Sequence, residues 1–172
     1  MTAGPVVIIG AGHAGFQLAM SLRQHGFSER IALLNDEGHL PYQRPPLSKA
    51  YLKGTGAPDS LMFRPEKFYS DQNIDLISDR AVSIDRAARK VLLGSGSSLE
   101  YGHLVLATGA RNRLLDIPNA NLDGVRYLRT LDESRSLRDH IAPGQRVVVV
   151  GAGFISACRS PASRATAAKS TA

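Results

Sequence analysis

Cysteine is nearly missing from this sequence. Cys158 is the only one in 172 residues, so the chain forms no internal disulfide, and chemistry that relays electrons through a pair of thiols is excluded. A low cysteine content is typical of proteins from reducing compartments. We therefore predict a cytoplasmic location.

Long apolar runs are missing as well. No segment approaches the roughly 20 apolar residues that span a bilayer. The N-terminus leads from Met1 into the short apolar run Val6–Ile9 without the cationic, apolar and cleavage regions of a signal peptide. We expect neither a membrane partner nor a secretory leader.

Patterns for metal binding and for hydrolysis are also lacking. The histidines lie at positions 13, 25, 39, 103 and 140, without H-x-x-x-H spacing and without cysteine partners, which predicts that the chain has no metal site. No nucleophile elbow and no Ser–His–Asp pattern occurs.

The formal charge is +6, and half of it comes from Arg159, Arg164 and Lys169 in segment 156–172, which holds no acid. The other half is spread along residues 1–155. Neither an aromatic RNA-binding signature nor zinc-finger spacing accompanies it. We therefore predict no nucleic-acid partner, and a basic interaction module is the least favoured of three functional interpretations.

The N-terminal pattern predicts a strand–helix–strand unit. Val6–Ile9 is a β-branched run typical of a buried parallel strand. Residues His13 to His25 show helical spacing, and Ile31–Leu34 predicts a second buried strand. The expected apolar stripe of the helix consists of Ala14, Leu18, Ala19 and Leu22.

Further elements follow along the chain. The prolines of residues 40–49 predict a stiff extended loop, with a short helix from Pro46. We expect a helical turn or two over residues 65–72, a small antiparallel meander over 75–100, a strand over 104–107, a helix over 131–141 and a strand over 147–150. The fold class is therefore α/β, with a Rossmann-like dinucleotide-binding domain.

A G-x-G-x-x-G fingerprint, Gly10-Ala11-Gly12-His13-Ala14-Gly15, follows the first strand and opens the helix. The first glycine permits a tight turn, the second lets a pyrophosphate approach, and the third lets helix and strand pack closely. The helix N-terminus then offers unpaired N–H groups to the phosphates. Asp36, at the end of the second strand, lies 21 residues after Gly15, near the spacing expected for a ribose-binding acid.

A second fingerprint begins after residues 147–150 with Gly151 and Gly153, but Ser156 stands where its third glycine is expected. These residues predict only the start of a second, nicotinamide-binding domain. The Ala-, Ser- and Arg-rich segment that follows has no apolar period and predicts a disordered tail. The expected domains are residues 1–142, 143–155 and the tail 156–172.

These features together resemble the NADH-dependent ferredoxin reductases of bacterial oxygenase systems, the family of the putidaredoxin, rhodocoxin and rubredoxin reductases. The likeness covers residues 5–155, and the proline-rich segment is its most specific part. The matching stretches are GAGHAG at 10–15, LPYQRPPLSKAYL at 40–52, LVLATG at 104–109 and YLRT at 127–130.

The resemblance implies an FAD enzyme that takes a hydride from NADH and passes single electrons to a [2Fe–2S] ferredoxin or a rubredoxin, which serves an oxygenase such as a cytochrome P450. Lys49 matches a lysine near flavin N5, where a fixed cation favours the anionic reduced flavin. The expected cofactor-binding residues are Gly10, Gly12, His13, Ala14, Gly15, Asp36, Glu37, Arg44, Pro45, Lys49, Val82, Ala107, Thr108, Gly109 and Arg129.

The sequence departs from the family after Ile155. Cys158 replaces the glutamate that would pair with the flavin-site lysine, and the rest of the family's NADH domain, its second FAD segment and its C-terminal domain are missing from residues 1–172. One hypothesis is a truncation or frameshift after the Ile155 codon, which would make the tail out-of-frame translation. The open interpretations are a reductase, of which this chain is a partial fragment, and a non-catalytic FAD-binding pseudoenzyme.

Overall fold

The computed structural model describes residues 4–141, 145–150 and 166–167. Contacts divide the chain into two compact units. The first comprises Met1–Gln43 and Met62–Ala110, and the second comprises Arg44–Leu61 and Arg111–Ala172. Each unit is described by itself below. The predicted boundaries at residues 142 and 155 fall on residues outside the described ranges, so they stay predictions.

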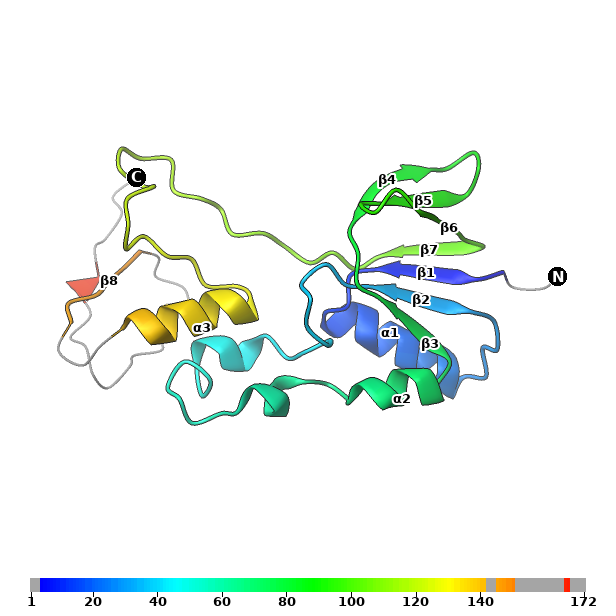
Figure 1. The fold of residues 1–172 in the computed structure, drawn as a ribbon, viewed down its shortest axis with the longest axis horizontal. Helices are drawn as coiled ribbons and strands as arrows, with labels where there is room; N and C mark the ends of the chain where they lie inside the picture. Colours follow the sequence, from blue (N-terminus) through cyan, green and yellow to red (C-terminus); the bar gives the residue numbers. More distant parts are fainter. Residues whose placement is uncertain (1–3, 142–144, 151–165, 168–172) are drawn as a thin grey trace. The chain divides into compact units, whose positions relative to one another are not determined.

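The first unit is built on a four-stranded parallel sheet (Figure 1). Its strands are β1 (Val6–Ile9), β2 (Ile31–Leu34), β3 (Ile74–Ile77) and β7 (His103–Leu106), in the spatial order β3-β2-β1-β7. β1 is central and pairs with β2 and β7 over its whole length. The carboxyl ends of β1, β2 and β7 consequently lie along one edge of the sheet.

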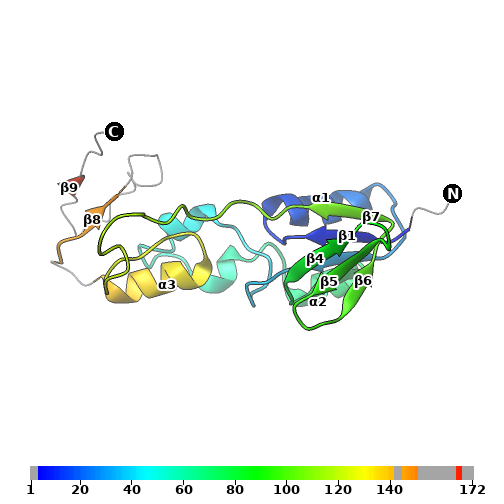
Figure 2. The same cartoon turned by 90° about the horizontal axis from the view of Figure 1, so that it is seen from above.

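Two layers cover this sheet, because its short apolar strands alternate between both faces (Figures 1 and 2). On one face α1 (His13–Gln24) and α2 (Glu66–Asp71) pack against Ile8 and Leu33. On the other, Val7 and Leu34 contact a three-stranded antiparallel sheet. Its strands are β4 (Ala81–Asp85), β5 (Lys90–Leu93) and β6 (Ser98–Glu100).

The helix face of this core is aromatic as well as aliphatic. Tyr69 of α2 is 2% exposed and lies edge-on to Phe16 of α1, with ring centroids 6.2 Å apart. Burial raises the pKa of Tyr69 to about 12, against a smaller opposing effect of Arg64. Its role is therefore in the core rather than in proton transfer near neutral pH.

The predicted α/β class is confirmed, but two local predictions are wrong. Residues 74–77 do not open the antiparallel meander: they form β3, which pairs in parallel with β2. Ala14 is exposed, and the buried residues of α1 are Gly15, Phe16 and Ala19. Leu18 and Leu22 pack against the core while partly buried, as predicted.

The described residues of the second unit contain little regular structure. Its helices are α3 (Leu131–His140) and the 3₁₀ turns η1 (Pro45–Ser48) and η2 (Pro58–Leu61). Figures 1 and 2 show α3 beside η1. The strand predicted at 147–150 is β8 (Val148–Val149), which pairs in parallel with β9 (Thr166–Ala167). The rest of the segment predicted to be disordered lies outside the described residues.

None of the described helices is both long enough and apolar enough to cross a membrane.

Arg23, near the end of α1, joins two turns of the first unit. Its guanidinium donates to four backbone carbonyls: Phe27 O at 2.5 Å, Glu29 O and Gln72 O at 2.8 Å, and Asn73 O at 2.6 Å. These carbonyls belong to the turn before β2 and to the turn before β3. The planar fork of arginine suits such multiple donation, which the single ammonium of lysine does not reproduce.

We therefore expect Arg23→Met to lower the free energy of unfolding by about 3 kcal/mol, because four carbonyls lose a charged donor. Arg30→Met is the matched control. Arg30 pairs with Asp75 at 2.6 Å with both side chains about half exposed, so its loss should cost less than about 1 kcal/mol. Urea unfolding followed by circular dichroism measures both changes. If both variants lose the same free energy of unfolding, the four bonds to carbonyls stabilise the fold no more than the exposed ion pair does.

Candidate functional site

Most predicted site residues of the first unit meet at the carboxyl edge of the parallel sheet. Gly10 follows β1, Asp36 and Glu37 follow β2, and Ala107 follows β7. In open parallel sheets ligands bind at this edge, where loops from neighbouring strands diverge. The topology therefore brings together three segments that lie up to about 100 residues apart in the sequence.

Gly10 lies in a position that other residues cannot occupy. Its φ is +108°, a conformation disfavoured by side chains. A Cβ at this position would lie 2.3 Å from Ala107 O and 2.7 Å from Ala107 C. The turn after β1 and the segment after β7 therefore pass each other in backbone contact, and the glycine is needed for this crossing.

Gly15 and Gly12 differ in what surrounds them. A Cβ on Gly15 would lie 1.9 Å from Gly10 O and 3.2 Å from Ile8 Cγ2, so this glycine sets the close approach of α1 to β1. A Cβ on Gly12 would meet no atom within 4 Å. Gly12 is thus not required by packing within the described residues, and the space in front of it is open to a ligand.

The N-terminus of α1 borders this open space. The first bond of the helix runs from Phe16 N–H to Gly12 O at 2.9 Å, so the N–H groups of His13, Ala14 and Gly15 have no acceptor within α1. Gly12 is the N-cap and supplies no side-chain cap, and the first turn holds no acidic residue. Unpaired N–H groups and the positive end of the helix dipole favour an anion here.

The two acids after β2 have different surroundings. Glu37 accepts a hydrogen bond from the hydroxyl of Tyr42, which is 4% exposed. Asp36 is exposed, and within the described part of the chain its carboxylate has no hydrogen bond or ion pair. Asp36 is therefore available to a ligand hydroxyl, whereas Glu37 already anchors the loop that follows.

Aromatic side chains pack around the N-terminus of α1, at the carboxyl edge of the parallel sheet. This packing was not predicted from the sequence. The ring of Phe63 stacks on Phe16, with centroids 4.5 Å apart and planes within 7°. It also meets the His13 ring edge-on at 4.9 Å. The N–H of Phe63 donates to Pro41 O at 2.9 Å. Nothing in the local sequence pattern signals the ring contacts of Phe63, because Phe16 and His13 lie about 50 positions before it.

The remaining predicted residues of the first unit lie on loops or strand ends. Thr108 and Gly109 follow β7 and are exposed, with Gly109 at φ +67°. Val82 is 54% exposed and lies at a register shift between β4 and β5. Such a bulge turns a side chain out of the regular alternation.

The other predicted residues, Arg44, Pro45, Lys49 and Arg129, belong to the second unit. Arg44 and Pro45 are the N-cap and first residue of η1, and Lys49 is its C-cap. Lys49 is exposed and makes no ion pair with any residue that the structure describes.

Arg129 immediately precedes Thr130, the N-cap of α3, which forms a capping box with Glu133. The Glu133 backbone N–H donates to Thr130 Oγ1 at 3.2 Å, and Glu133 Oε2 accepts from the N–H groups of Arg129 at 2.6 Å and Thr130 at 3.0 Å. Arg44 Nη1 donates to Arg129 O at 3.2 Å. Glu133 was not among the predicted residues, although the T-x-x-E pattern signals a capping box.

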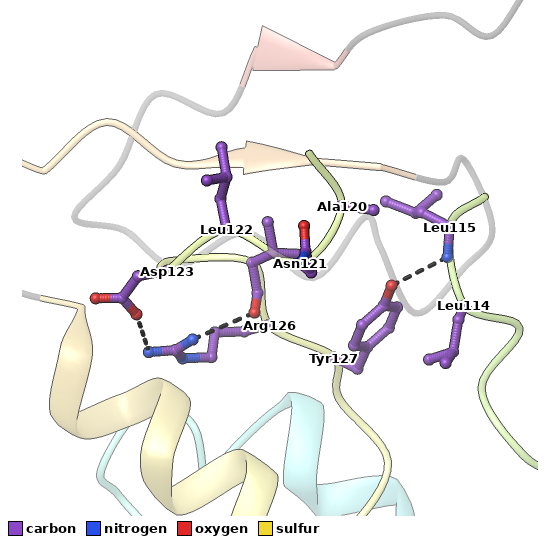
Figure 3. Close-up of a pocket in the computed structure, with 9 residues that line it drawn as sticks. Leu114, Leu115, Ala120, Asn121, Leu122, Asp123, Arg126 and Tyr127 are labelled. Carbon is purple, nitrogen blue, oxygen red and sulfur yellow. Dashed lines mark hydrogen bonds and ion pairs between the residues drawn. The ribbon is translucent and has the colours of Figure 1, made fainter. Parts of the chain in front are cut away.

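A surface cavity in the second unit contains none of the predicted residues (Figure 3). It measures about 600 Å³ and is lined by Leu114, Leu115, Ala120, Asn121, Leu122, Asp123, Val125, Arg126 and Tyr127. In it Leu115 N–H donates to Tyr127 Oη at 3.0 Å. A hydrogen bond from Arg126 lowers the pKa of Asp123. Neither feature indicates a particular ligand.

Metal ligation is not suggested by the described residues, which contain no group of three or more His, Cys, Asp or Glu side chains placed to hold an ion. The second-fingerprint residues Gly151, Gly153, Ser156 and Cys158 lie outside the described ranges.

Comparison with known proteins places these observations in a family. The sequence model of the pyridine nucleotide-disulphide oxidoreductase family matches residues 4–161 of this chain. Rhodocoxin reductase of Rhodococcus erythropolis is 54% identical over 151 residues, which are 87% of this chain and 35% of the relative. The chain thus spans about a third of that protein's length.

Solved structures of reductases are also similar to this chain in fold and in sequence. The ferredoxin reductase of the CYP199A2 system from Rhodopseudomonas palustris is 70% identical, with a TM-score of 0.86 over 88% of this chain and 38% of that one. The reductase in the covalent putidaredoxin reductase–putidaredoxin complex is 39% identical, with a TM-score of 0.82 over 88% and 37%. These matches confirm the resemblance inferred from the sequence.

Proposed function

Because the chain belongs to the pyridine nucleotide-disulphide oxidoreductase family, we propose that it binds FAD and forms the FAD-binding part of an NADH-dependent ferredoxin reductase. The observation that carries the proposal is the glycine turn after β1. Gly10 and Gly15 are required by backbone contacts, whereas Gly12 faces open space beside the unpaired N–H groups of α1. This contrast suits a pyrophosphate at the turn.

The residues of the first unit have distinct roles in this proposal. The N–H groups of the first turn of α1 bind the pyrophosphate, and the open space at Gly12 admits it. The Asp36 carboxylate accepts from a ribose hydroxyl. Glu37, through its bond with Tyr42, holds the loop after β2 in place. The remaining predicted contacts of this unit are His13, Ala14, Val82, Ala107, Thr108 and Gly109.

Lys49 and Arg129 supply the cations of the proposed site. The flavin, when bound, accepts a hydride from NADH and releases electrons singly. Lys49 has no ion pair among the described residues, so its charge is available to favour an anionic reduced cofactor. We propose a ferredoxin or rubredoxin as the electron acceptor, since one similar protein is named a ferredoxin reductase for the CYP199A2 system and another is complexed with putidaredoxin.

A second candidate is an FAD-binding protein without reductase activity. Ser156 replaces the third glycine of the second fingerprint, and Cys158 replaces the glutamate that pairs with the flavin-site lysine in the family. Both changes would weaken binding of NADH or tuning of the flavin. This candidate shares the FAD site with the first and differs only in electron transfer.

Visible absorption spectroscopy tests both candidates. Residues 1–172 are incubated with excess FAD and desalted, and NADH is added without air. A retained flavin band that bleaches supports the reductase, and a retained band that does not bleach supports the FAD-binding protein. If no flavin is retained, the proposal fails.

Asp36→Ala provides a test of a single contact. We expect the dissociation constant for FAD to rise about tenfold, because one charged hydrogen bond to the ribose is lost. Asp71→Ala, which removes an acid from the end of α2 in the same unit, is the control and should leave the affinity unchanged. Isothermal titration measures both. An unchanged affinity in Asp36→Ala would remove this residue from the proposed site.

A further inference from the structure

Glu133 makes one hydrogen bond more than its capping box requires. A capping box needs the glutamate carboxylate only at the N–H of the N-cap residue, here Thr130. The Glu133 Oε2 atom also accepts from Arg129 N–H, one residue outside the helix. That additional bond, at 2.6 Å, is shorter than the 3.0 Å bond within the box.

The backbone of Arg129 is thereby held on both sides. Its N–H donates to Glu133, and its C=O accepts from Arg44 Nη1 at 3.2 Å. Fixing both peptide groups fixes φ and ψ, and with them the direction of the Cα–Cβ bond. Arg129 as a whole is partly buried, and its guanidinium makes no hydrogen bond or ion pair to any described residue. Arg129 thus has a fixed backbone and an available cationic head.

The α3 helix also holds the turn η1. Ser134, which is fully buried, donates from Oγ to Leu47 O at 2.7 Å, and Leu47 is 2% exposed. This bond joins α3 to η1, the turn whose N-cap is Arg44 and whose C-cap is Lys49. Two side chains of α3 therefore hold the backbone at Arg129 and the backbone of η1.

We propose that Glu133 is a positioning residue for ligand binding: with Arg44, it holds the backbone of Arg129 so that the Arg129 guanidinium is presented to an anionic group of the bound dinucleotide. This inference rests on the proposed FAD binding and adds residues to it. In this proposal Glu133 itself does not contact the ligand. Arg44 acts through the Arg129 carbonyl.

The expected effect of Glu133→Ala is a rise of about tenfold in the dissociation constant for FAD, because Arg129 loses its orientation. Glu133→Gln keeps an oxygen acceptor of similar shape and should bind FAD within about threefold of wild type. Thr130→Ala is the matched control: it removes the other bond of the capping box and destabilises α3 by about 1 kcal/mol, but keeps the bond to Arg129 N–H. Its affinity should change less than about twofold.

A double-mutant cycle separates positioning from a general loss of structure. In an Arg129→Ala background, Glu133→Ala should cause no further loss of FAD affinity, because the residue through which it acts is absent. The inference is overturned if Glu133→Ala loses the same factor with and without Arg129. It is also overturned if Thr130→Ala weakens binding as much as Glu133→Ala, or if Glu133→Gln is as weak as the alanine variant.

Amide hydrogen exchange of the FAD-free chain gives a readout that does not depend on the cofactor. The Arg129 N–H should exchange about tenfold faster in Glu133→Ala than in wild type, and at the wild-type rate in Thr130→Ala. If wild type retains no FAD, the proposed function fails, while this comparison still shows whether Glu133 holds the Arg129 backbone. Equal Arg129 exchange in wild type and Glu133→Ala would overturn it.

Discussion

Replacement of Gly12 by aspartate should abolish FAD binding and leave the fold intact. A Cβ on Gly12 meets no atom within 4 Å, and the residue has φ −71° and ψ −168°, which side chains adopt without strain. Aspartate is also a favoured N-cap, and an acid at a helix N-terminus interacts well with the dipole. We therefore expect the free energy of unfolding to stay equal or to rise by a few tenths of a kcal/mol.

The same substitution places a carboxylate where we propose that the pyrophosphate lies. Two unit charges about 4 Å apart repel by about 4 kcal/mol at an effective dielectric constant near 20. The FAD dissociation constant should therefore rise by more than about 100-fold.

Gly12→Asn is the control for the charge of the aspartate. It has nearly the same size and the same capping ability without the charge, so it should weaken binding less than Gly12→Asp. Fluorescence titration of FAD and urea unfolding measure the two properties on one sample. Full retention of FAD by Gly12→Asp would exclude the turn after β1 as the phosphate site.

The strand–helix–strand unit could be predicted from the sequence because its signals are local. The apolar runs of β1 and β2 and the spacing of Gly10, Gly12 and Gly15 all lie within residues 6–34, and the observed element bounds agree within a residue. The position of Asp36 follows from the same spacing. The structure adds the spatial reason for Gly10 and Gly15, because it shows which backbone atoms a Cβ at each position would meet.

Pairing between distant segments could not be predicted in this way. A run such as Ile74–Ile77 fits a parallel or an antiparallel partner, and only the crossover through α2 places it beside β2. The bond from Arg44 to Arg129 O joins residues 85 positions apart, and the bond from Ser134 to Leu47 O joins residues 87 apart. No periodicity records such contacts. Arg44 was predicted as a cofactor contact, and its bond to the Arg129 carbonyl appears only in the structure.

Substitution of Gly15 should affect mainly stability, whereas substitution of Gly12 should affect mainly FAD binding. Packing requires Gly15, and ligand access in the proposed site requires Gly12. A Cβ there would lie 1.9 Å from Gly10 O and 3.1 Å from Gly10 C, and these backbone atoms cannot rotate away as a flexible side chain does. Either α1 moves away from β1 or the turn at Gly10 changes shape. The crossing of Gly10 and Ala107 depends on that same turn, so the strain reaches the segment after β7.

We therefore expect Gly15→Ala to lower the free energy of unfolding by about 3 kcal/mol, and to lose FAD affinity as the turn is displaced. Gly12→Ala is the matched control, with the same substitution three residues earlier in open space, and should cost no more than about 1 kcal/mol, the usual loss of a poor N-cap. Urea unfolding of both variants followed by circular dichroism gives the comparison. Similar stabilities in the two variants would mean that α1 and β1 lie further apart in solution than the Gly15–Gly10 contact requires.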